Sequence, residues 1–332
     1  MKLMKLAALG MAIAPMAACA QTQPVAPVEA VPREAVVYFT SDISPEGLVR
    51  VYKALGVEPD GKVAVKISTG ESEKSHQLDP ALIKDLVQSV NGTLVECNTA
   101  YGGNRATTAD HMKAIDKRGY REIAPVVIMD AESEMQIPVQ DTTWIKHDIV
   151  GSHLADYDFM INLAHFKGHA MGGFGGVLKN ASIGVASSNG KIYIHTAGVN
   201  DNVSQGWMNG RGQDPFLESM AAAAQGVHNY FKNRNGIVYI DVMNNMSVDC
   251  DCNGNPAAPE LKNIGILAST DPVALDKACL DLVFGHKANT PGDNADPLIE
   301  RINSRHGTHT VEHAEKIGLG TTCYKLVNID KK

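Results

Sequence analysis

The 332-residue sequence is poor in aromatic side chains and has no excess of positive charge. Phenylalanine, tryptophan and tyrosine together make up 5% of the residues, and the formal net charge at pH 7 is −7. Proteins that bind single strands stack bases on aromatic rings, and every nucleic-acid surface needs basic side chains. These two shortages exclude nucleic acid from the expected partners.

Several motifs that identify classes of enzyme are also missing. The sequence contains no P-loop, no G-x-G-x-x-G that opens a helix and no G-x-S-x-G nucleophile elbow. It has no Cys-x-x-Cys pair, so a ferredoxin-type run of four cluster-binding cysteines is absent. What remains is an ordinary globular composition, 44% hydrophobic and 20% charged, which suffices for one large domain or two modest ones.

The apolar run at the N-terminus is too short to span a bilayer as a mature helix. It covers Leu6–Met16, and the basic residues Lys2 and Lys5 precede it. A basic segment followed by a short apolar run is typical of a secretory signal peptide. The sequence therefore predicts a signal peptide over residues 1–19 and an exported mature protein.

Two cleavage sites compete after this segment. Met16-Ala17-Ala18-Cys19 resembles a bacterial lipobox, with Met where Leu is usual, and would make Cys19 the lipidated N-terminus. Ala18-Cys19-Ala20 instead fits a signal peptidase site, with cleavage before Gln21. Residues 20–35 are rich in Pro, Ala and Val and have the composition of a flexible tether, which favours the first alternative. We expect a periplasmic or outer-membrane lipoprotein that meets the membrane through its lipid anchor alone.

The sequence contains six cysteines, of which five remain once Cys19 is lipidated or removed. Five cannot all pair within one chain, so at least one thiol is a metal ligand, a reactive group or a buried inert cysteine. Cys250 and Cys252 flank a single residue, and side chains i and i+2 of an extended chain point the same way, so both sulfur atoms can face one metal. The alternatives are buried thiols or a disulfide to another cysteine, namely Cys97, Cys279 or Cys323.

The rest of the chain alternates short β-branched strands with capped helices. Helix starts stand at Ser44-Pro45, Asp79-Pro80 and Asp271-Pro272. This order predicts one α/β domain over residues 36–330, with a mainly parallel sheet and helices on both faces. The expected strands cover residues 62–67, 93–96, 125–129, 159–163, 191–195, 236–242 and 264–268, with a candidate edge strand at 324–329.

Polar loops follow several of these strands. They cover residues 68–71, 97–105, 130–134 and 164–180. In parallel α/β folds ligands bind at the carboxyl ends of the strands, where such loops meet. The sequence therefore predicts that the four loops converge on one crevice.

Residues 162–188, NLAHFKGHAMGGFGGVLKNASIGVASS, form the most site-like of these segments. His165 and His169 are four residues apart with Lys167 between them, and a run of glycines follows, which lets a ligand approach the backbone closely. The alternative is a tight turn that carries surface histidines. We expect the ligand contacts to come from this glycine-rich segment and the 97–105 loop, namely from Asn98, Arg105, Gly172, Gly173, Gly175, Gly176, Lys179 and Asn180.

Four segments together resemble a family of uncharacterised proteins. They are NLAHFKGHAMGGFGGVLKNASIG, CNTAYGGNR at 97–105, CDC at 250–252 and LASTDPVALDKACLDLV at 267–283. By these segments the sequence is identified as a member of the domain of unknown function 362 family. The resemblance covers about residues 36–330, and members of this family are often described as iron–sulfur centre proteins. Longer relatives carry ferredoxin-type cysteine runs, which this chain lacks.

The resemblance implies that the histidines and Lys167 of the central segment belong with Cys250 and Cys252 to a shared core motif, but it supplies no reaction. Two thiolates and two imidazoles form the tetrahedral ligand set that zinc prefers. From the residues themselves we expect a transition metal, most simply zinc, bound by His165, His169, Cys250 and Cys252. An iron–sulfur cluster is the second possibility.

Three classes of function fit this sequence. The first is a metal-dependent or redox enzyme that acts on an anionic small molecule, with Lys167 as its acid, base or anion partner. The second is a binding lipoprotein without catalysis, which holds an anionic ligand on the glycine-rich backbone. The third is an envelope lipoprotein whose loops are merely structural. A bound metal would separate the first class from the other two.

Overall fold

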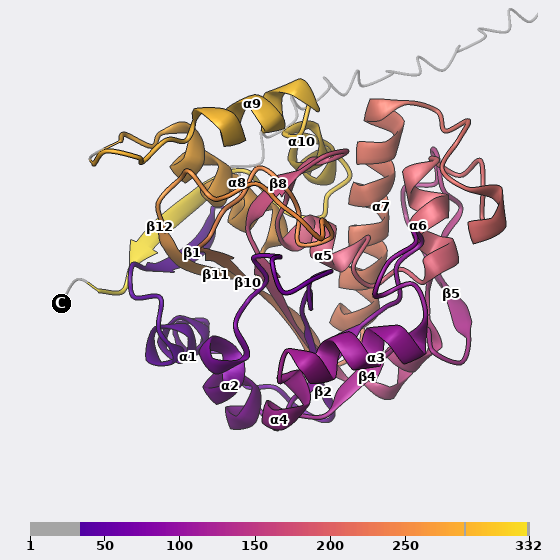
Figure 1. Cartoon of the computed structure of the whole chain (residues 1–332), viewed down its shortest axis with the longest axis horizontal. Coiled ribbons are helices and arrows are strands. Elements are labelled where there is room, and N and C mark those ends of the chain that lie inside the picture. Colours follow the sequence, from indigo (N-terminus) through magenta and orange to yellow (C-terminus); the bar gives the residue numbers. More distant parts are fainter. Residues whose placement is uncertain (1–33, 289, 331–332) are drawn as a thin grey trace, which may run out of the picture. The chain divides into compact units, whose positions relative to one another are not determined.

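A mainly parallel eight-stranded sheet forms the centre of the computed structural model, which describes residues 34–288 and 290–330 (Figure 1). Its strands are β1 (Ala35–Thr40), β2 (Val63–Lys66), β3 (Thr93–Glu96), β4 (Val126–Ile128), β7 (Phe159–His165), β10 (Gly236–Met243), β11 (Gly265–Ser269) and β12 (Tyr324–Asn328). They lie in the order β12-β1-β11-β10-β7-β2-β3-β4. All neighbours are parallel except β11, which is antiparallel to both β1 and β10. The predicted α/β fold is confirmed.

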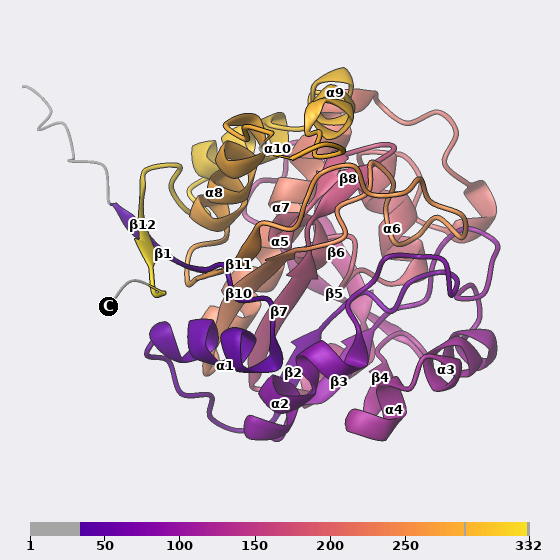
Figure 2. The same cartoon turned by 60° about the vertical axis from the view of Figure 1, so that its left-hand side comes forward.

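Helices cover both faces of this sheet, as the alternation of strands and helices predicts (Figure 2). One face carries α1 (Pro45–Ala54), α2 (Pro80–Ser89), α3 (Thr108–Lys117) and α4 (Tyr120–Ile123). The other carries α5 (Val177–Ala181), α7 (Gln213–Lys232), α8 (Pro272–Phe284), α9 (Asp296–Ser304) and α10 (His309–Lys316). Two short 3₁₀ helices cover Ser152–Asp156 and Val203–Gln205.

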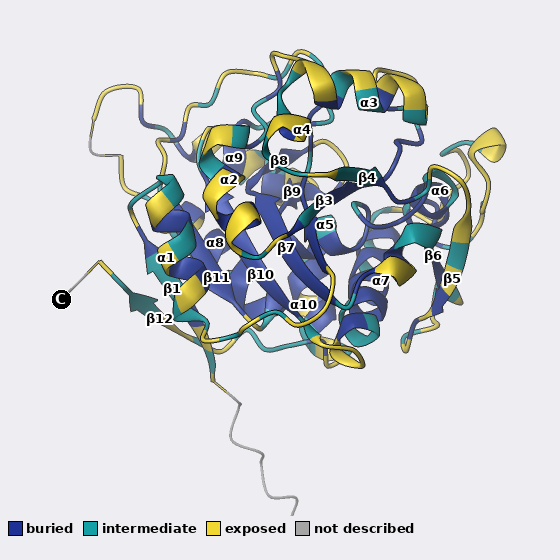
Figure 3. Cartoon of the chain, turned by 90° about the horizontal axis from the view of Figure 1, so that it is seen from below, coloured by how far each residue is buried: buried dark blue, intermediate teal, exposed yellow. Residues whose placement is uncertain are grey.

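The central strand β7 shows how the sequence builds the two-sided core. All seven of its residues are buried, which is typical of a strand covered on both faces (Figure 3). Ile161 and Leu163 join the cluster beneath α1 and α2, whereas Met160 and Ala164 join the cluster beneath α5, α7 and α8. Successive side chains of a strand point to opposite faces, so this one apolar run supplies both cores.

The helix starts lie where the sequence places them. The side chains of Ser44, Asp79 and Asp271 each accept a hydrogen bond from a backbone N–H in the first turn of α1, α2 and α8. These bonds satisfy N–H groups that have no partner within the helix. The candidate edge strand near the C-terminus is also confirmed, because β12 pairs with β1 alone at one end of the sheet.

The prediction of a strand over residues 191–195 is wrong. These residues end a helix, α6 (Ser188–His195), which the Ser187 hydroxyl caps by accepting from the N–H of Gly190. The alternating pattern KIYIH covers five residues only, and a run this short fits a buried helix as well as a strand. Ile192, Tyr193 and Ile194 are all buried, and Tyr193 and Ile194 pack in one apolar cluster with residues of α7.

Two small hairpins were not predicted from the sequence. One consists of β5 (Glu134–Pro138) and β6 (His147–Gly151). The other consists of β8 (Lys167–His169) and β9 (Gly173–Gly175), inside the glycine-rich segment. Gly173, the first residue of β9 after the turn, has a φ of +81° that other residues rarely adopt.

The predicted signal peptide, Cys19 and almost all of the predicted tether lie outside the described residues. The last tether residue, Ala35, already belongs to β1. Within residues 34–288 and 290–330, the search for a helix both long and apolar enough to cross a membrane found none.

Candidate functional site

The carboxyl ends of four neighbouring parallel strands meet at one edge of the sheet. Lys66 of β2 lies opposite Val95 of β3 and Asn162 of β7, and His165 of β7 lies opposite Val242 of β10. The chain leaves all four strands in the same direction, so the loops that follow them are brought together. This is the position at which open α/β sheets bind ligands.

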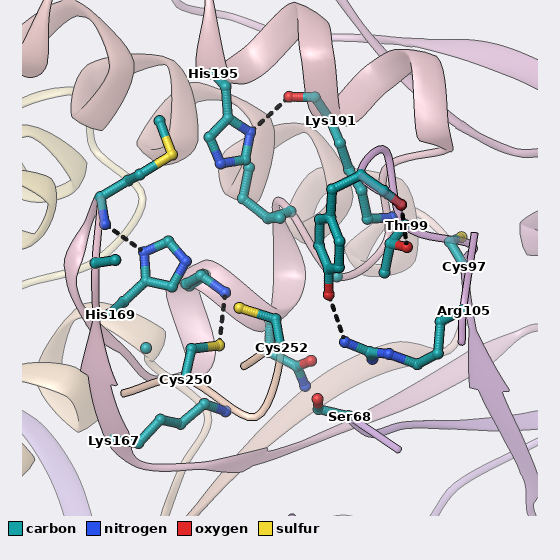
Figure 4. Close-up of a pocket in the computed structure, with 18 of the residues that line it drawn as sticks. Ser68, Cys97, Thr99, Arg105, Lys167, His169, Lys191, His195, Cys250 and Cys252 are labelled. Carbon is teal, nitrogen blue, oxygen red and sulfur yellow. Dashed lines mark hydrogen bonds between the residues drawn. The ribbon is translucent and has the colours of Figure 1, made fainter. Parts of the chain in front are cut away.

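A cavity of about 340 Å³ lies between these loops (Figure 4). Its walls come from Ser68 after β2, from the segment 97–105 after β3, from 167–184 after β7 and from Cys250 and Cys252 after β10. The helix α6 contributes Lys191 and His195, and Trp207 closes one side. Three of the four loops expected to converge therefore do so, but no residue of 130–134 is among the described residues of the wall.

His169, Cys250 and Cys252 come together in this cavity. Each offers one atom that can bind a metal, and these atoms all lie within 4.8 Å of one another. All five cysteines of the described residues are free thiols, so the disulfide alternatives for Cys250 and Cys252 are not formed. The set of one imidazole and two sulfur atoms fits zinc and other metals that favour thiolates.

The two thiols differ in charge. A hydrogen bond from the Cys252 thiol lowers the pKa of Cys250 well below its usual value. Burial raises this pKa, whereas the charges of Lys179 and Lys167 lower it further. The same hydrogen bond, together with burial, raises the pKa of Cys252. Lys179 Nζ lies 3.8 Å from Cys250 Sγ. The lowered pKa favours the thiolate form of Cys250, which is the form that binds metals and attacks electrophiles.

The orientation of His169 is fixed by the glycine-rich turn. The backbone N–H groups of Met171 and Gly172 donate to its Nδ1, at 3.3 and 2.8 Å. Burial, followed by the charge of Lys179, lowers the pKa of His169 well below its usual value, so the ring is neutral. Because Nδ1 accepts hydrogen bonds, the proton of the neutral ring is on Nε2, the nitrogen left for the cavity.

His165 does not join this group. Its Nδ1 lies 2.9 Å from Asp251 Oδ1, and its Nε2 lies 2.6 Å from the carbonyl oxygen of Asn244. Both ring nitrogens are therefore engaged within the protein, and the structure places three of the four expected metal ligands together. His165 instead holds the short segment that carries the two cysteines.

Asp251, which stands between the two cysteines, contacts both His165 and Lys167. Lys167 Nζ lies 2.9 Å from Asp251 Oδ2, and all three side chains are buried. Burial alone would raise the pKa of this carboxyl group, but Lys167 and His165 hold it well below its usual range. Asp251 in turn raises the pKa of Lys167, although burial acts in the opposite direction. Lys167 is therefore a positively charged wall residue rather than a base.

The opposite wall contains a buried network of paired charges. Glu96 Oε2 lies 3.0 Å from Lys66 Nζ, and Glu96 Oε1 lies 3.3 Å from Arg105 Nη1. Arg105 Nε also lies 3.2 Å from Glu71 Oε2. Lys179 and Lys191 are different, because neither forms an ion pair with a carboxylate of the described residues. These two ammonium groups give the cavity positive charge that a bound anion would balance.

The expected ligand-binding residues divide into two groups. Those that line the cavity are Arg105, Gly175, Gly176, Lys179 and Asn180. The remaining three shape the walls from behind. Asn98 bonds to Thr108 and His111, Gly172 orients His169, and Gly173 begins β9 after the hairpin turn.

Sequence reasoning missed His195 as a site residue because it assigned the residue to a strand. In the helix α6 its Nδ1 bonds to the Lys191 carbonyl oxygen at 2.7 Å, and its ring stacks on Phe216. Burial lowers the pKa of His195 to about 4, so the ring is neutral. With Nδ1 donating to a carbonyl group, Nε2 carries a lone pair and can accept a proton. His169 and His195 thus offer a donor and an acceptor to one cavity.

The position of the two cysteines relative to His169 depends on Gly168. A Cβ atom added there would lie 2.2 Å from the carbonyl oxygen of Val248, two residues before Cys250. Backbone cannot move aside as a flexible side chain can, so Gly168→Ala is expected to push the cysteine segment away from β8. We predict at least tenfold weaker zinc binding, measured by titration of zinc against a chromophoric competitor.

The control for this variant is Gly102→Ala, because a Cβ atom at Gly102 has nothing within 4 Å. Gly102→Ala should bind zinc as the unaltered protein does. Equal zinc affinity in the two variants would contradict the role given to Gly168.

The fold and site define an α/β protein with a cavity that contains two free cysteines, at the carboxyl edge of a mainly parallel sheet. The chain belongs to the family described as "Domain of unknown function (DUF362)", whose model matches residues 63–281. This confirms the resemblance noted from the sequence. No curated protein sequence matches the chain.

Two solved structures resemble this one at low sequence identity. One is the lactate racemase apoprotein from Thermoanaerobacterium thermosaccharolyticum, with 11% identity, a TM-score of 0.40 and coverage of 90% of this chain and 85% of that one. The other is a crystal structure of a protein from Thermotoga maritima, with 12% identity, a TM-score of 0.41 and coverage of 82% of this chain and 58% of that one.

Proposed function

We propose that the cavity is the active site of a metal-dependent enzyme that acts on an anionic small molecule. The observation that carries this proposal is the convergence of Cys250, Cys252 and His169, whose ligand atoms lie within 4.8 Å of one another in the same cavity as two lysines without carboxylate partners. Cys250 and Cys252 would hold the metal, which zinc fits best, and His169 would be the third ligand. Binding would release the proton of Cys252 and would move the ring proton of His169 from Nε2 to Nδ1, in place of the hydrogen bonds that Nδ1 accepts from Met171 and Gly172.

Three protein ligands leave a coordination position open, which is the arrangement of catalytic rather than structural zinc sites. A metal in this position supplies a Lewis acid that polarises an oxygen of the ligand. The residues of the chain bind and orient the ligand around that point. Lys179 and Lys191 attract its negative charge, Lys167 keeps its own proton, and the neutral His195 accepts a proton at Nε2.

The proton on His169 Nε2 favours a second function, because this proton would have to leave Nε2 before the atom could bind a metal. In this alternative Cys250 and Cys252 act as a redox pair without metal. The Cys250 thiolate attacks one sulfur atom of a disulfide substrate and expels the other as a thiolate. Cys252, once it has passed its proton to that thiolate, attacks Cys250 Sγ, forms the Cys250–Cys252 disulfide and expels the first substrate sulfur, so the substrate gains two electrons. Quantification of free thiols before and after mild oxidation distinguishes the two, because a zinc-bound pair is protected from oxidation.

The charge of Lys179 gives the anion proposal a direct test. Lys179→Gln is expected to weaken the binding of small carboxylates and of inorganic phosphate about tenfold, because the variant loses one cationic side chain that has no carboxylate partner. Binding is measured as ligand-induced thermal stabilisation. Lys179→Arg keeps the charge and should retain most of the affinity.

The control for Lys179→Gln is Lys113→Gln, which removes a lysine that is 77% exposed on α3. Equal loss of anion affinity in both variants would show that net charge, and not the cavity, binds the anion. Stabilisation by an anion in protein that holds no metal would instead support the non-catalytic binding protein.

Export through a lipid anchor is proposed from the sequence alone. We expect the mature chain to begin at Cys19 with a lipid attached, so that it partitions with membranes although its domain has no membrane contact of its own. Mass spectrometry of the N-terminal peptide tests this. A free N-terminus at Gln21 would rule out the anchor and leave a secreted protein.

A further inference from the structure

A second cluster of metal-binding side chains lies outside the cavity, where α7 packs against α10 (Figure 1). It consists of Glu218 on α7 and of His309 and His313 on α10, which are one helical turn apart on the same face. Each offers one ligand atom, and these atoms all lie within 4.8 Å of one another. None of the three residues lines the cavity.

Three potential ligand atoms of this cluster lie close together, one from each side chain. Glu218 Oε1 lies 3.0 Å from His309 Nε2 and 3.5 Å from His313 Nδ1. His313 is 5% exposed, and its Nδ1 is a buried atom that makes no hydrogen bond within the described residues. A buried ring nitrogen without a hydrogen bond is costly unless something binds it.

Outer contacts hold these groups in the orientation that a metal needs. His313 Nε2 donates to Asp141 Oδ2 at 2.7 Å, which leaves Nδ1, the nitrogen that faces Glu218, as the ring atom available to a metal. The second oxygen of Glu218 accepts from the indole N–H of Trp144 at 2.5 Å. Carboxylates behind histidine ligands, and donors behind carboxylate ligands, are the usual outer shell of zinc sites.

The other ring nitrogen of His309 has a partner of the same kind. Its Nδ1 lies 3.8 Å from Glu312 Oε2, whereas its Nε2 donates to Glu218 Oε1 at 3.0 Å, so a metal must displace the proton on Nε2. The side chains of His309 and Glu218 are 21% and 18% exposed, so an ion can reach the cluster from solvent. The three ligand atoms are therefore held close together, and one side of the cluster is open.

We propose that Glu218, His309 and His313 form a second metal site, which binds a divalent ion of the zinc class. Two imidazoles and one carboxylate with an open position make a ligand set found at zinc sites. The ion joins α7 to α10, so it fixes the C-terminal helices on the sheet. Zinc binding requires the displacement of the proton that His309 Nε2 shares with Glu218.

The test uses the full chain carrying Cys250→Ser and Cys252→Ser, so that the cavity contributes no thiolate ligand. After treatment with a chelator, this protein is titrated with zinc alone. We expect one equivalent to bind with a Kd of about 1 μM or tighter. Saturation should raise the Tm by about 5 °C.

Adding His309→Gln and His313→Gln to the same background should abolish the binding and the rise in Tm. Asp141→Asn should retain binding but weaken it about 10–100-fold, because the outer carboxylate is lost and the ligands remain. The matched control is His153→Gln, a partly exposed histidine that belongs to none of the groups of potential metal ligands among the described residues. It should bind zinc as the background protein does.

Two results would overturn this second site. The first is a background protein that binds less than about a tenth of an equivalent of zinc under these conditions. The second is a His309→Gln/His313→Gln protein, folded by circular dichroism, that still binds a full equivalent. Cobalt separates this site from the cavity, because only the cysteine site gives thiolate-to-cobalt charge-transfer absorption. Failure of either site therefore leaves the other testable.

Discussion

Replacing Asp251 with asparagine is expected to destabilise the fold by about 3–5 kcal/mol. The carboxylate contacts Lys167 Nζ and His165 Nδ1, each at 2.9 Å, in surroundings from which water is excluded. An amide keeps the shape but leaves Lys167 as a buried cation without its anionic partner. Denaturant unfolding of Asp251→Asn and of the unaltered protein, with the metal removed from both, measures the difference in free energy.

The control for Asp251→Asn is Asp249→Asn, two residues earlier in the same segment. Asp249 pairs with Arg301 at 3.4 Å, but the two side chains are 22% and 25% exposed. Partly exposed ion pairs contribute about 1 kcal/mol or less to the free energy of unfolding. An equal loss of stability in the two variants would mean that Asp251 does not organise the cysteine segment.

The second large effect is expected from Glu96→Gln. Burial would raise the pKa of Glu96, but Lys66, Arg105 and His111 together lower it to about 2, from a usual 4.5. The difference corresponds to about 3 kcal/mol of stability at neutral pH. Glu96→Gln should lose about that amount at pH 7.

The pH dependence of Glu96→Gln tests the cause of this loss. The folded-state pKa is depressed, so the contribution of Glu96 is fully present above pH 4.5 and is lost as the pH falls toward about 2. The difference in unfolding free energy between the two proteins should therefore shrink as the pH is lowered from 5 to about 3. A difference that stays constant over this range would show that lost packing, and not lost charge, destabilises the variant.

Much of the fold could be predicted because its signals are local. The runs that became β2, β3, β7 and β10 are short, apolar and β-branched, and capping residues precede α1, α2 and α8. Local signals failed where two structures fit the same pattern. The alternation at 191–195 fitted a strand, but these residues continue a helix that Ser187 caps and that packs against α7.

The location of the site could be predicted from the sequence, but the contacts of its residues could be predicted only in part. The loops after parallel strands had to meet at one edge, so Cys250, Cys252 and His169 could be expected to converge. The role of His165 could not be predicted, because it depends on Asp251, which lies 86 residues away in the sequence. The pairing of His309 with Glu218, 91 residues apart, likewise arises from the packing of two helices.

The most direct test of the central claim is elemental analysis of protein purified without added metal. Both proteins compared carry His309→Gln and His313→Gln, so that the second cluster binds no metal. One of them keeps both cysteines, and the other also carries Cys250→Ser and Cys252→Ser. We predict about one equivalent of a transition metal in the chain with both cysteines and none in the serine variant. Less than about a tenth of an equivalent in the former, or the same metal content in both, would contradict a metal site at Cys250 and Cys252.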